Sequence, residues 1–216
     1  MFARVSDITS YLYCPRLCYY RNRFEEDYVS EMHAARDIYI TLRMDMDRDW
    51  ACKKFISYYG EKYKSLFNQA AQKFVYSSIL QEVEGVDWDA LLQSENYRLK
   101  GKVDELVRTS KDKAPLVLSL TSPEKDVWFR DRIRLTAFCM MLGSSTGYVY
   151  HCYDGKLKQI DVERKDKRNV LKLVERVLNI KKGFIPEKRD DKKCSKCLFQ
   201  QRCENKHSTF AQRFFG

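Results

Sequence analysis

Three cysteines near the end of the chain have the spacing of a metal or cluster site. Cys194, Cys197 and Cys203 form a C-x2-C-x5-C pattern in a polar segment. Such a segment buries too little apolar surface to fold by itself, so a crosslinking metal would explain why it is ordered. Three thiolates are one short of the four that a zinc ion or an iron–sulfur cluster takes, and the spacing fits both groups. We therefore expect a fourth thiolate from a distant part of the chain.

Two cysteines near the start of the chain are candidates for this fourth ligand. Cys14 has the better sequence context, because it lies in the motif Tyr11-x-x-Cys14-Pro15-Arg16. Cys18, four residues later, is its rival. The remaining cysteines lie in periodic apolar segments, where a cysteine is usually a small buried hydrophobe; they are Cys52, Cys139 and Cys152.

The positive charge of the chain is concentrated at one end. The 216 residues carry a formal net charge of +10. Residues 1–155 contain 22 basic and 22 acidic side chains, whereas residues 156–216 contain 18 basic and 8 acidic ones. A concentrated positive field of this kind typically binds a polyanion by releasing counterions from phosphates. The alternative is a solvated basic face without a partner.

The composition excludes several classes of protein. The chain is 44% hydrophobic and 32% charged, with only 8 Gly and 4 Pro, which is unlike disordered or collagenous sequences. No run approaches the roughly 20 apolar residues of a membrane-spanning helix. The N-terminal sequence MFARVSDITS lacks the apolar centre of a signal peptide. We therefore expect a cytoplasmic protein with no membrane partner.

The elements that must position these residues alternate between helix and strand. A helix is expected over residues 7–13 with Ser6 as its cap, and two helical pieces are expected from Ser30 to Glu82, separated by Gly60. After these we expect strands at 97–109 and 116–120 joined by a turn from Lys111, and a helix at 131–142 that ends at Gly143. A hairpin at 147–152 and 157–162 with its turn at Asp154-Gly155, and a helix at 166–182, follow. This order predicts an α/β (α+β) fold with a mixed sheet and a metal-binding C-terminal subdomain.

Three features together resemble the CRISPR-associated iron–sulfur exonucleases, the Cas-four family, from Tyr11 to Cys203. They are the tyrosine-led Cys-Pro-Arg motif, the distal C-x2-C-x5-C pattern, and a Gly101-x-x-Asp104 strand between them. The resemblance implies a RecB-like PD-(D/E)xK nuclease core, with N- and C-terminal segments joined by an iron–sulfur cluster. It also implies the cluster ligands, a [4Fe–4S] cluster being favoured over [2Fe–2S]: Cys14, Cys194, Cys197 and Cys203.

The resemblance implies a division of the chain into four regions. Residues 1–30 form an N-terminal segment with the first cluster cysteine, and residues 31–95 form a helical region. Residues 96–185 form the nuclease-like α/β core, and residues 186–216 form the cluster-binding subdomain.

The resemblance also implies a site for Mn²⁺ or Mg²⁺, of which only part is present. The family's metal-binding histidine and aspartate fall on His33 and Asp104. The Glu-x-Lys motif that should follow is substituted, because Ser119 stands at the Glu position and Thr121 at the Lys position. A hard cation is poorly held by one carboxylate and one imidazole, and a threonine cannot supply the positive charge of a lysine. We therefore expect nuclease activity to be weak or lost.

Other residues are candidates to replace the missing lysine or to bind DNA. Lys102, which shares a strand face with Asp104, and Lys125, in the loop beyond Thr121, are candidates to replace the missing lysine. Arg134 and Phe138 stand where the family has Gln-x-x-x-Tyr, and the planar donor fork of Arg134 suits a DNA phosphate. On the basic helix, the expected DNA-binding residues are Lys165, Lys172 and Arg176.

The function that follows is a DNA-binding protein of CRISPR adaptation, which selects or processes DNA fragments with the integrase proteins Cas-one and Cas-two. An active Mn²⁺- or Mg²⁺-dependent single-stranded DNA exonuclease with a rearranged site is one alternative. A zinc-bound interaction module unrelated to nucleases is the other.

Overall fold

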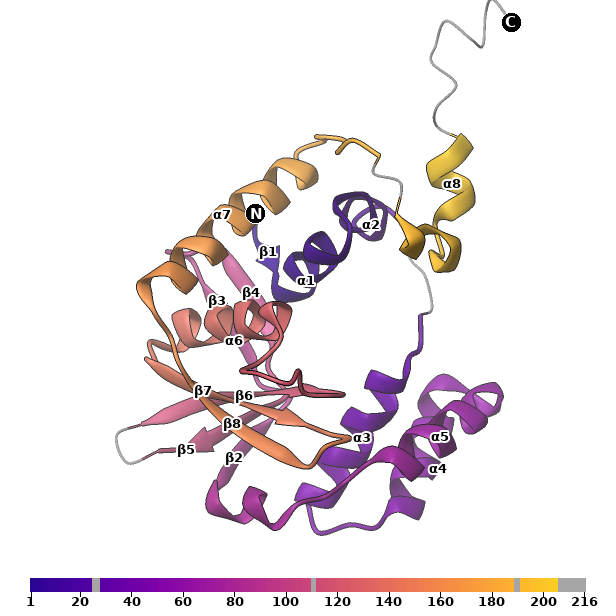
Figure 1. Ribbon diagram of the computed structural model, residues 1–216, viewed down its shortest axis with the longest axis vertical. Helices are drawn as coiled ribbons and strands as arrows, with labels where there is room; N and C mark the ends of the chain where they lie inside the picture. Colours follow the sequence, from indigo (N-terminus) through magenta and orange to yellow (C-terminus); the bar gives the residue numbers. More distant parts are fainter. Residues whose placement is uncertain (25–27, 110–111, 189–190, 206–216) are drawn as a thin grey trace, which may run out of the picture.

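The chain folds into two mixed sheets flanked by helices (Figure 1). The structure is a computed structural model, and the residues that it describes are 1–24, 28–109, 112–188 and 191–205. Lys111 of the predicted turn and residues 206–216 of the predicted C-terminal region lie outside the described residues. In the described part of the chain, no helix is both long and apolar enough to cross a membrane.

The larger sheet has five strands in the order β2-β5-β6-β7-β8. Their bounds are Gly85–Trp88 (β2), Glu105–Arg108 (β5), Lys113–Ser119 (β6), Thr146–His151 (β7) and Lys156–Asp161 (β8). β6 and β7 are parallel, and the other neighbours are antiparallel. Helices cover both faces, so β6 is a nearly continuous apolar run, with Val117 in one core cluster and Leu116 and Leu118 in the other. The predicted strand at 116–120 and the hairpin at 147–162 are confirmed, with shifts of a few residues at their ends.

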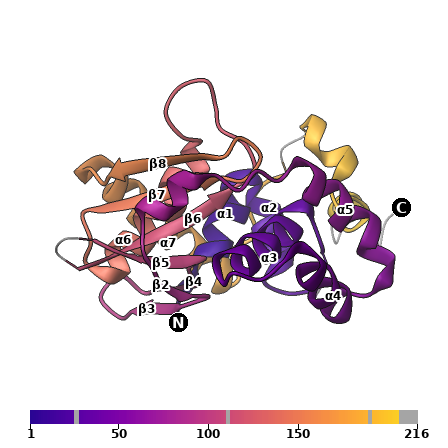
Figure 2. The ribbon, with the colours of Figure 1, turned by 90° about the horizontal axis from the view of Figure 1, so that it is seen from below.

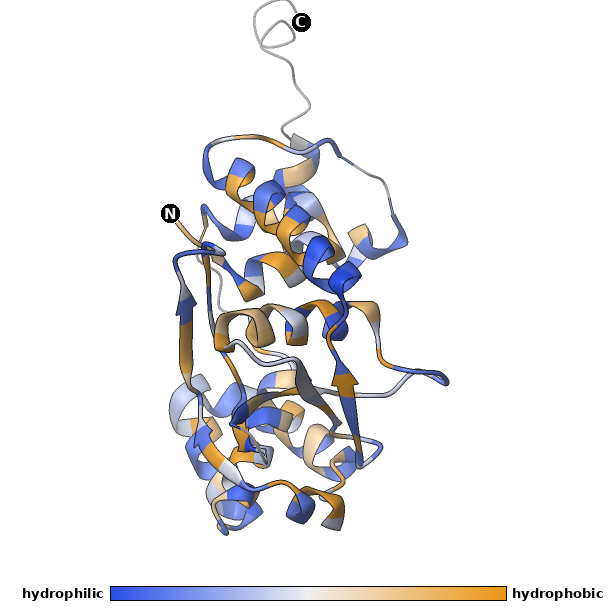
Figure 3. Ribbon diagram, turned by 90° about the vertical axis from the view of Figure 1, so that its left-hand side faces the viewer, coloured by the Kyte–Doolittle hydropathy of each residue, from blue (hydrophilic) through white to orange (hydrophobic). Residues whose placement is uncertain are grey.

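Four helices form the core on the face of the sheet that Val117 contacts: α1 (Val5–Tyr13), α2 (Pro15–Arg21), α6 (Phe129–Leu142) and α7 (Arg164–Lys181). α6 ends as predicted at Gly143, whose φ of 80° is a left-handed conformation that glycine adopts without strain. Hydrophobic and hydrophilic residues alternate in short stretches along α7, the long helix at the edge of Figure 1 (Figure 3). That pattern is typical of a helix with one face on the core and one in water, whereas α6 is buried on most of its sides.

The opposite face packs against three helices, where two helical pieces were expected. They are α3 (Glu31–Arg43), α4 (Arg48–Tyr59) and α5 (Lys64–Lys73), followed by the short 3-10 helix η2 (Ser78–Glu82). Gly60 separates α4 from α5 as predicted. The additional break between α3 and α4 is made by Asp45, which has a positive φ of 57°, and by Asp47, whose carboxylate caps α4 at Trp50 N. Aspartate at position 47 is a strong cap signal, and the apolar periodicity alone did not reveal it.

The smaller sheet has the order β1-β4-β3, with bounds Ala3–Arg4, Leu99–Lys102 and Leu91–Ser94. The single strand expected over 97–109 is therefore wrong: β4 belongs to this sheet and β5 to the larger one. The chain leaves one sheet and enters the other at Val103 and Asp104. β2 and β3 also lie in the region expected to be helical, 31–95, although the four-region division itself stays a prediction.

The last described segment lies beside α2, near the start of the chain (Figure 1; Figure 2 gives the view from below). The segment after α7 returns to α1 and α2 and contains the 3-10 helix η3 (Lys192–Lys196) and the short helix α8 (Gln200–Asn205). Phe199 is only 1% exposed and packs in the core cluster of α1 and α2. The structure thus brings together the two segments that contain the predicted cluster cysteines.

Candidate functional site

The four cysteines expected to bind a cluster line one cavity of about 50 Å³. Cys14 lies between α1 and α2, Cys194 lies in η3, Cys197 lies at the end of η3, and Cys203 lies in α8. All four are half-buried. The fold therefore gathers four thiol groups that are almost 190 residues apart at the extremes of the sequence.

Contacts between the two terminal segments hold this cavity in shape. The rings of Tyr20 and Phe199 stack with their centroids 5.3 Å apart, and the Tyr20 hydroxyl donates to the carbonyl of Arg202 at 3.1 Å. Arg16 Nε donates to the carbonyl of Pro186 at 2.8 Å. These contacts join α2 to the segment that contains the C-x2-C-x5-C pattern.

The thiol groups are close enough to affect one another. Burial raises the pKa of Cys197, and the neighbouring Cys14, Cys194 and Cys203 raise it further. Four thiolates in this space would repel one another unless a cation neutralised them. Arg16 Nη1 lies 3.9 Å from Cys203 Sγ, within reach of a weak hydrogen bond to sulfur. The cavity thus needs a positively charged occupant if all four thiols are ionised.

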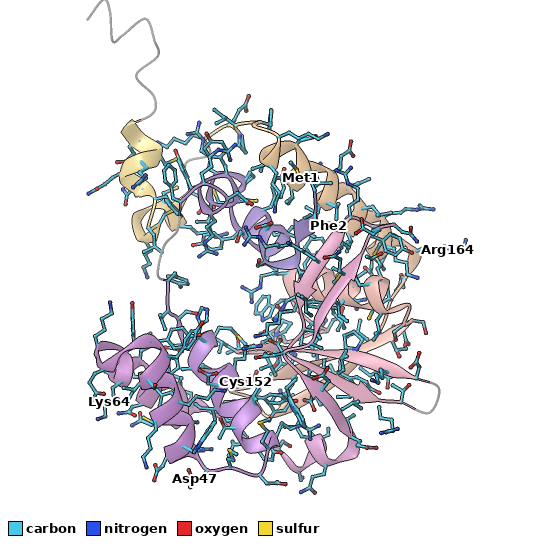
Figure 4. The ribbon with its side chains drawn as sticks, turned by 180° about the vertical axis from the view of Figure 1, so that it is seen from behind. Met1, Phe2, Asp47, Lys64, Cys152 and Arg164 are labelled. Atoms are coloured by element: carbon cyan, nitrogen blue, oxygen red, sulfur yellow. The ribbon has the colours of Figure 1, made fainter. Side chains whose placement is uncertain are left out.

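The other cysteines do not line this cavity. Cys18, the rival to Cys14, is fully buried beside Asn22, and burial raises the pKa of its thiol to about 12. Burial likewise raises the pKa of Cys139 to about 12, and it also raises the pKa of Cys152, which lies among α3 and the strands (Figure 4). Cys52 is half-buried in α4. Thiols that stay protonated are poor ligands, which agrees with the expectation that Cys139 and Cys152 are small core residues.

Asp104, the expected metal ligand, lies between β4 and β5 and is only 1% exposed. Its carboxylate already has three donors from the protein. Oδ2 accepts from the Leu118 main-chain N at 2.8 Å and from Arg134 Nη2 at 2.5 Å, and Oδ1 accepts from Arg36 Nε at 2.9 Å. Asp104 is therefore the centre of a buried ion-pair cluster that joins α3, β6 and α6.

Arg134 directs its guanidinium into the protein. Besides Asp104, it donates from Nη1 to the carbonyl of Leu118 at 2.8 Å, and its side chain is only 20% exposed. Both ends of the fork that was expected to bind a DNA phosphate are thus engaged with protein oxygens. Lys125, one of the two candidates to replace the missing lysine, lies in the loop between β6 and α6 and is exposed.

Lys102 pairs with a carboxylate other than Asp104. Its Nζ lies 3.0 Å from Asp89 Oδ2, and Asp89 also pairs with Arg36. The expectation that Lys102 and Asp104 share a strand face is wrong, because β4 ends at Lys102 and the chain turns before β5 begins. Arg36 connects the two carboxylates, since it pairs with both Asp89 and Asp104.

His33 lies at the start of α3, one helical turn before Arg36. Its Nδ1 is 3.1 Å from Ser30 N and 2.9 Å from Ser30 Oγ, and its ring packs edge-on against Tyr59. Burial lowers the pKa of His33, and the nearby Arg36 lowers it further, so the imidazole is neutral at pH 7. Among the described residues, no three His, Cys, Asp or Glu side chains are grouped so that they could hold a single metal ion.

Ser119 and Thr121, at the substituted motif positions, make different contacts. Ser119 is buried and its hydroxyl donates to Asp131 Oδ2 at 2.7 Å. Asp131, in the first turn of α6, is itself only 1% exposed. The Thr121 carbonyl accepts from Trp128 Nε1 at 2.8 Å and lies 3.0 Å from His151 Nδ1. A buried carboxylate from α6 thus stands beside the strand position at which the resemblance leads us to expect a glutamate.

Several important residues of this centre were missed in the sequence. Arg36 and Asp131 had a usable signal, because each lies three positions from a residue already singled out, His33 and Arg134 respectively, and so shares a helix face with it. Asp89 had none, because it lies in the turn between β2 and β3, far in sequence from its partners.

The basic residues of α7 lie on the outside of the molecule. Lys165, Lys172 and Arg176 are all exposed, and Lys165 pairs with Glu163 at 3.0 Å. Arg164, at the start of this helix, lies at the periphery (Figure 4). Because Val170 and Val177 face the core, the basic side chains form one outward face of a single helix.

Comparison with known proteins gives one sequence relative and a shared fold. No known protein-family profile matches the chain. The chain is 36% identical over 211 residues to an uncharacterized protein from Archaeoglobus fulgidus. The aligned residues cover 98% of this chain and 99% of the relative. The crystal structure of a "putative exonuclease" from Eubacterium rectale superposes with a TM-score of 0.62 at 14% identity, covering 93% of this chain and 87% of the other. That likeness shows that the two proteins have the same fold.

Proposed function

We propose that this chain, which belongs to the same family as the uncharacterized protein from Archaeoglobus fulgidus, is a Cas-four-like iron–sulfur protein that binds DNA with little or no nuclease activity. The observation that supports this proposal best is the cavity lined by Cys14, Cys194, Cys197 and Cys203 within a nuclease-like fold. The distant cysteines of a family signature meet at one place, as a shared ligand requires.

The proposed occupant of the cavity is an iron–sulfur cluster, with one zinc ion as the alternative. Cysteine thiolates bind both groups. The choice of a cluster rests on the resemblance of the cysteine motifs to an iron–sulfur family, and the cavity supplies the four cysteines that either group would need. When bound, a [4Fe–4S] or [2Fe–2S] cluster would supply four iron–thiolate crosslinks. Arg16 would stand beside it and offset part of the negative charge of the thiolates.

The polyanion partner is proposed to be DNA, and the outward face of α7 is its proposed contact. Lys165, Lys172 and Arg176 are exposed along this helix. Long basic side chains on a regular helix bind the phosphate backbone without reading sequence. The basic face of α7 thus supports DNA as a partner, and the resemblance adds the CRISPR integrase proteins Cas-one and Cas-two as proposed partners in the selection or processing of DNA fragments.

Loss of cleavage is proposed from the contacts of the motif positions. Ser119 supplies a hydroxyl that is already donated to Asp131, and Thr121 supplies no charge. A nuclease of this kind needs a cation that polarises the phosphate and an amine or similar group that stabilises the developing charge. The two substitutions remove the side chains that would do both.

The test combines spectroscopy, DNA binding and cleavage on anaerobically purified full-length protein. A brown protein with broad visible absorbance supports the cluster, and a colourless protein with one equivalent of zinc contradicts it. Single-stranded DNA should bind and stay uncut in Mn²⁺. Robust Mn²⁺-dependent cleavage that Asp104→Ala abolishes would contradict the proposal that the protein has little or no nuclease activity.

A triple variant tests the α7 surface specifically. Lys165→Ala, Lys172→Ala and Arg176→Ala together should lower the slope of log affinity against log salt by about 2 to 3, because each lost phosphate contact removes about 0.7 to 0.9. The matched control is Lys53→Ala, Lys62→Ala and Lys64→Ala, which removes three exposed charges from the α4–α5 region. An equal loss in both triple variants would mean that only net charge matters and that α7 is not the contact.

A further inference from the structure

Both carboxylate oxygens of Asp104 accept hydrogen bonds from groups of the protein. Arg36 donates to Oδ1, and Arg134 and the Leu118 main-chain N donate to Oδ2. The carboxylate is 2% exposed, whereas the two arginine side chains are 24% and 20% exposed. Two permanent positive charges therefore cover one buried negative charge.

Arg134 makes two contacts of the kind that a hard cation makes. Its guanidinium joins a carboxylate oxygen of Asp104 to the main-chain carbonyl oxygen of Leu118, at 2.5 and 2.8 Å. Carboxylate and carbonyl oxygens are the donors that Mg²⁺ and similar ions take. A guanidinium fork binds the same two oxygens through N–H groups, and it cannot be deprotonated at physiological pH.

The fold requires such a group at this position. β5 pairs with β6 only as far as Glu105 opposite Leu116, so the main chain at Leu118 lies beyond the last pair of this ladder. Asp104 accepts from the Leu118 N–H and Arg134 donates to the Leu118 carbonyl. Both buried main-chain groups are thereby satisfied where the neighbouring strand is absent.

The surrounding charges oppose the entry of another cation. Asp89, the next carboxylate, pairs with both Arg36 and Lys102. The connected cluster of Arg36, Lys102, Arg134, Asp89 and Asp104 carries three positive and two negative charges. A divalent cation at Asp104 would therefore meet a net positive field and would have to displace two guanidinium groups.

We infer that the guanidinium groups of Arg134 and Arg36 stand where a divalent cation would bind beside Asp104, so that this centre is held together without metal. The residues present do not fit the Mn²⁺ or Mg²⁺ expected at His33 and Asp104. The inference goes beyond the proposed function, because it concerns how α3, β6 and α6 are joined whether or not the chain binds DNA.

The experiment is a Mn²⁺ titration of the purified full-length protein, with free Mn²⁺ followed by its electron paramagnetic resonance signal. The wild type should bind no Mn²⁺ at Asp104, so its curve should coincide with that of Asp104→Asn. The double variant Arg36→Gln and Arg134→Gln should bind Mn²⁺ at least about tenfold more tightly than the wild type, because two positive charges beside the carboxylate are gone. The control is Arg108→Gln with Arg132→Gln, which removes two other ion-paired arginines that do not touch Asp104.

Two results would overturn the inference. One is Mn²⁺ binding by the wild type that Asp104→Asn abolishes. The other is a folded double variant that binds Mn²⁺ no better than the control. If the double variant does not fold, Mn²⁺ binding by the wild type and by Asp104→Asn still tests the inference, because both proteins retain Arg36 and Arg134.

Discussion

At the scale of single residues, the substituted motif positions belong to a new set of contacts. Ser119 donates to Asp131, a buried carboxylate that approaches from α6. Arg134, three residues further on the same helix, pairs with Asp104. The charges of this centre are therefore arranged around arginine and aspartate, and a glutamate at position 119 would disturb its neighbours.

Ser119→Glu should destabilise the fold by about 3 to 5 kcal/mol at neutral pH, because it places a second carboxylate beside buried Asp131 without a partner. Repulsion raises the pKa of such a pair above its value in the unfolded chain, so the destabilisation is fully present at high pH and shrinks as the pH falls. Urea unfolding of the variant at roughly pH 5 and pH 8 measures this difference. Ser119→Ala is the control, because it removes the hydroxyl without adding a carboxylate. A stable Ser119→Glu protein that cleaves DNA would show that this centre accepts the family glutamate.

At the scale of elements, α3 is joined to β5 by a second buried cluster, centred on Glu105. This carboxylate is fully buried, accepts from Arg43 Nη2 at 2.6 Å, and also accepts from the Tyr39 hydroxyl. Arg43 also donates hydrogen bonds to the carbonyls of Leu80 and Val83, both at 2.9 Å, and these bonds connect η2 to the cluster. The short distance between Glu105 and β2 leaves no space for a side chain at Gly85, where a Cβ would lie 2.2 Å from Glu105 Oε1.

Glu105→Ala should lower the free energy of unfolding by about 3 to 5 kcal/mol, because it leaves the Arg43 charge half-buried without its partner. Chemical denaturation followed by circular dichroism measures the change. Glu84→Ala is a matched control, since Glu84 pairs with Arg108 on the surface, where both side chains are 64% exposed. The control should lose less than about 1 kcal/mol. Similar losses in the two variants would mean that the buried cluster adds no more than a surface ion pair.

At the scale of the whole molecule, the two ends of the chain are brought together at the cysteine cavity. Cys14 comes from the first helical pair and the other three cysteines from the last described segment. A group bound by all four thiolates closes a loop of almost 190 residues, and crosslinks that close long loops restrict the unfolded chain most. The proposed cluster would therefore stabilise the entire fold, although it lies far from Asp104 along the chain.

Cys197→Ala should give insoluble or protease-sensitive protein, because loss of one thiolate weakens the binding of the cluster and the polar C-terminal segment has little core of its own. Cys52→Ala is the control, since Cys52 is also half-buried but lies in α4, outside the cavity. The measurement is the soluble yield together with limited proteolysis and the melting transition. A soluble Cys197→Ala protein that melts like the wild type would contradict a structural role for the site.

Much of the fold was determined by local patterns that the sequence displays directly. Neighbouring residues alone produce the apolar run of β6, the turn at Gly155 and the glycines that end α4 and α6. The bounds of the corresponding elements were predicted to within a few residues. The expectation that Cys194, Cys197 and Cys203 share one site also needed only residue types and spacing, whereas the resemblance was needed to name Cys14 as the fourth ligand. Its counterpart in the structure is the cavity that these cysteines line.

Contacts between distant residues were decided only by the tertiary structure. Nothing local to Asp104 shows that the chain changes sheets there, or that Arg36 and Arg134 converge on it from two helices. Spacing placed Lys102 beside Asp104, but the turn between β4 and β5 directs it to Asp89. The physical reason is that periodicity describes which face of an element a residue occupies, whereas the partner of a buried charge depends on how separate elements pack.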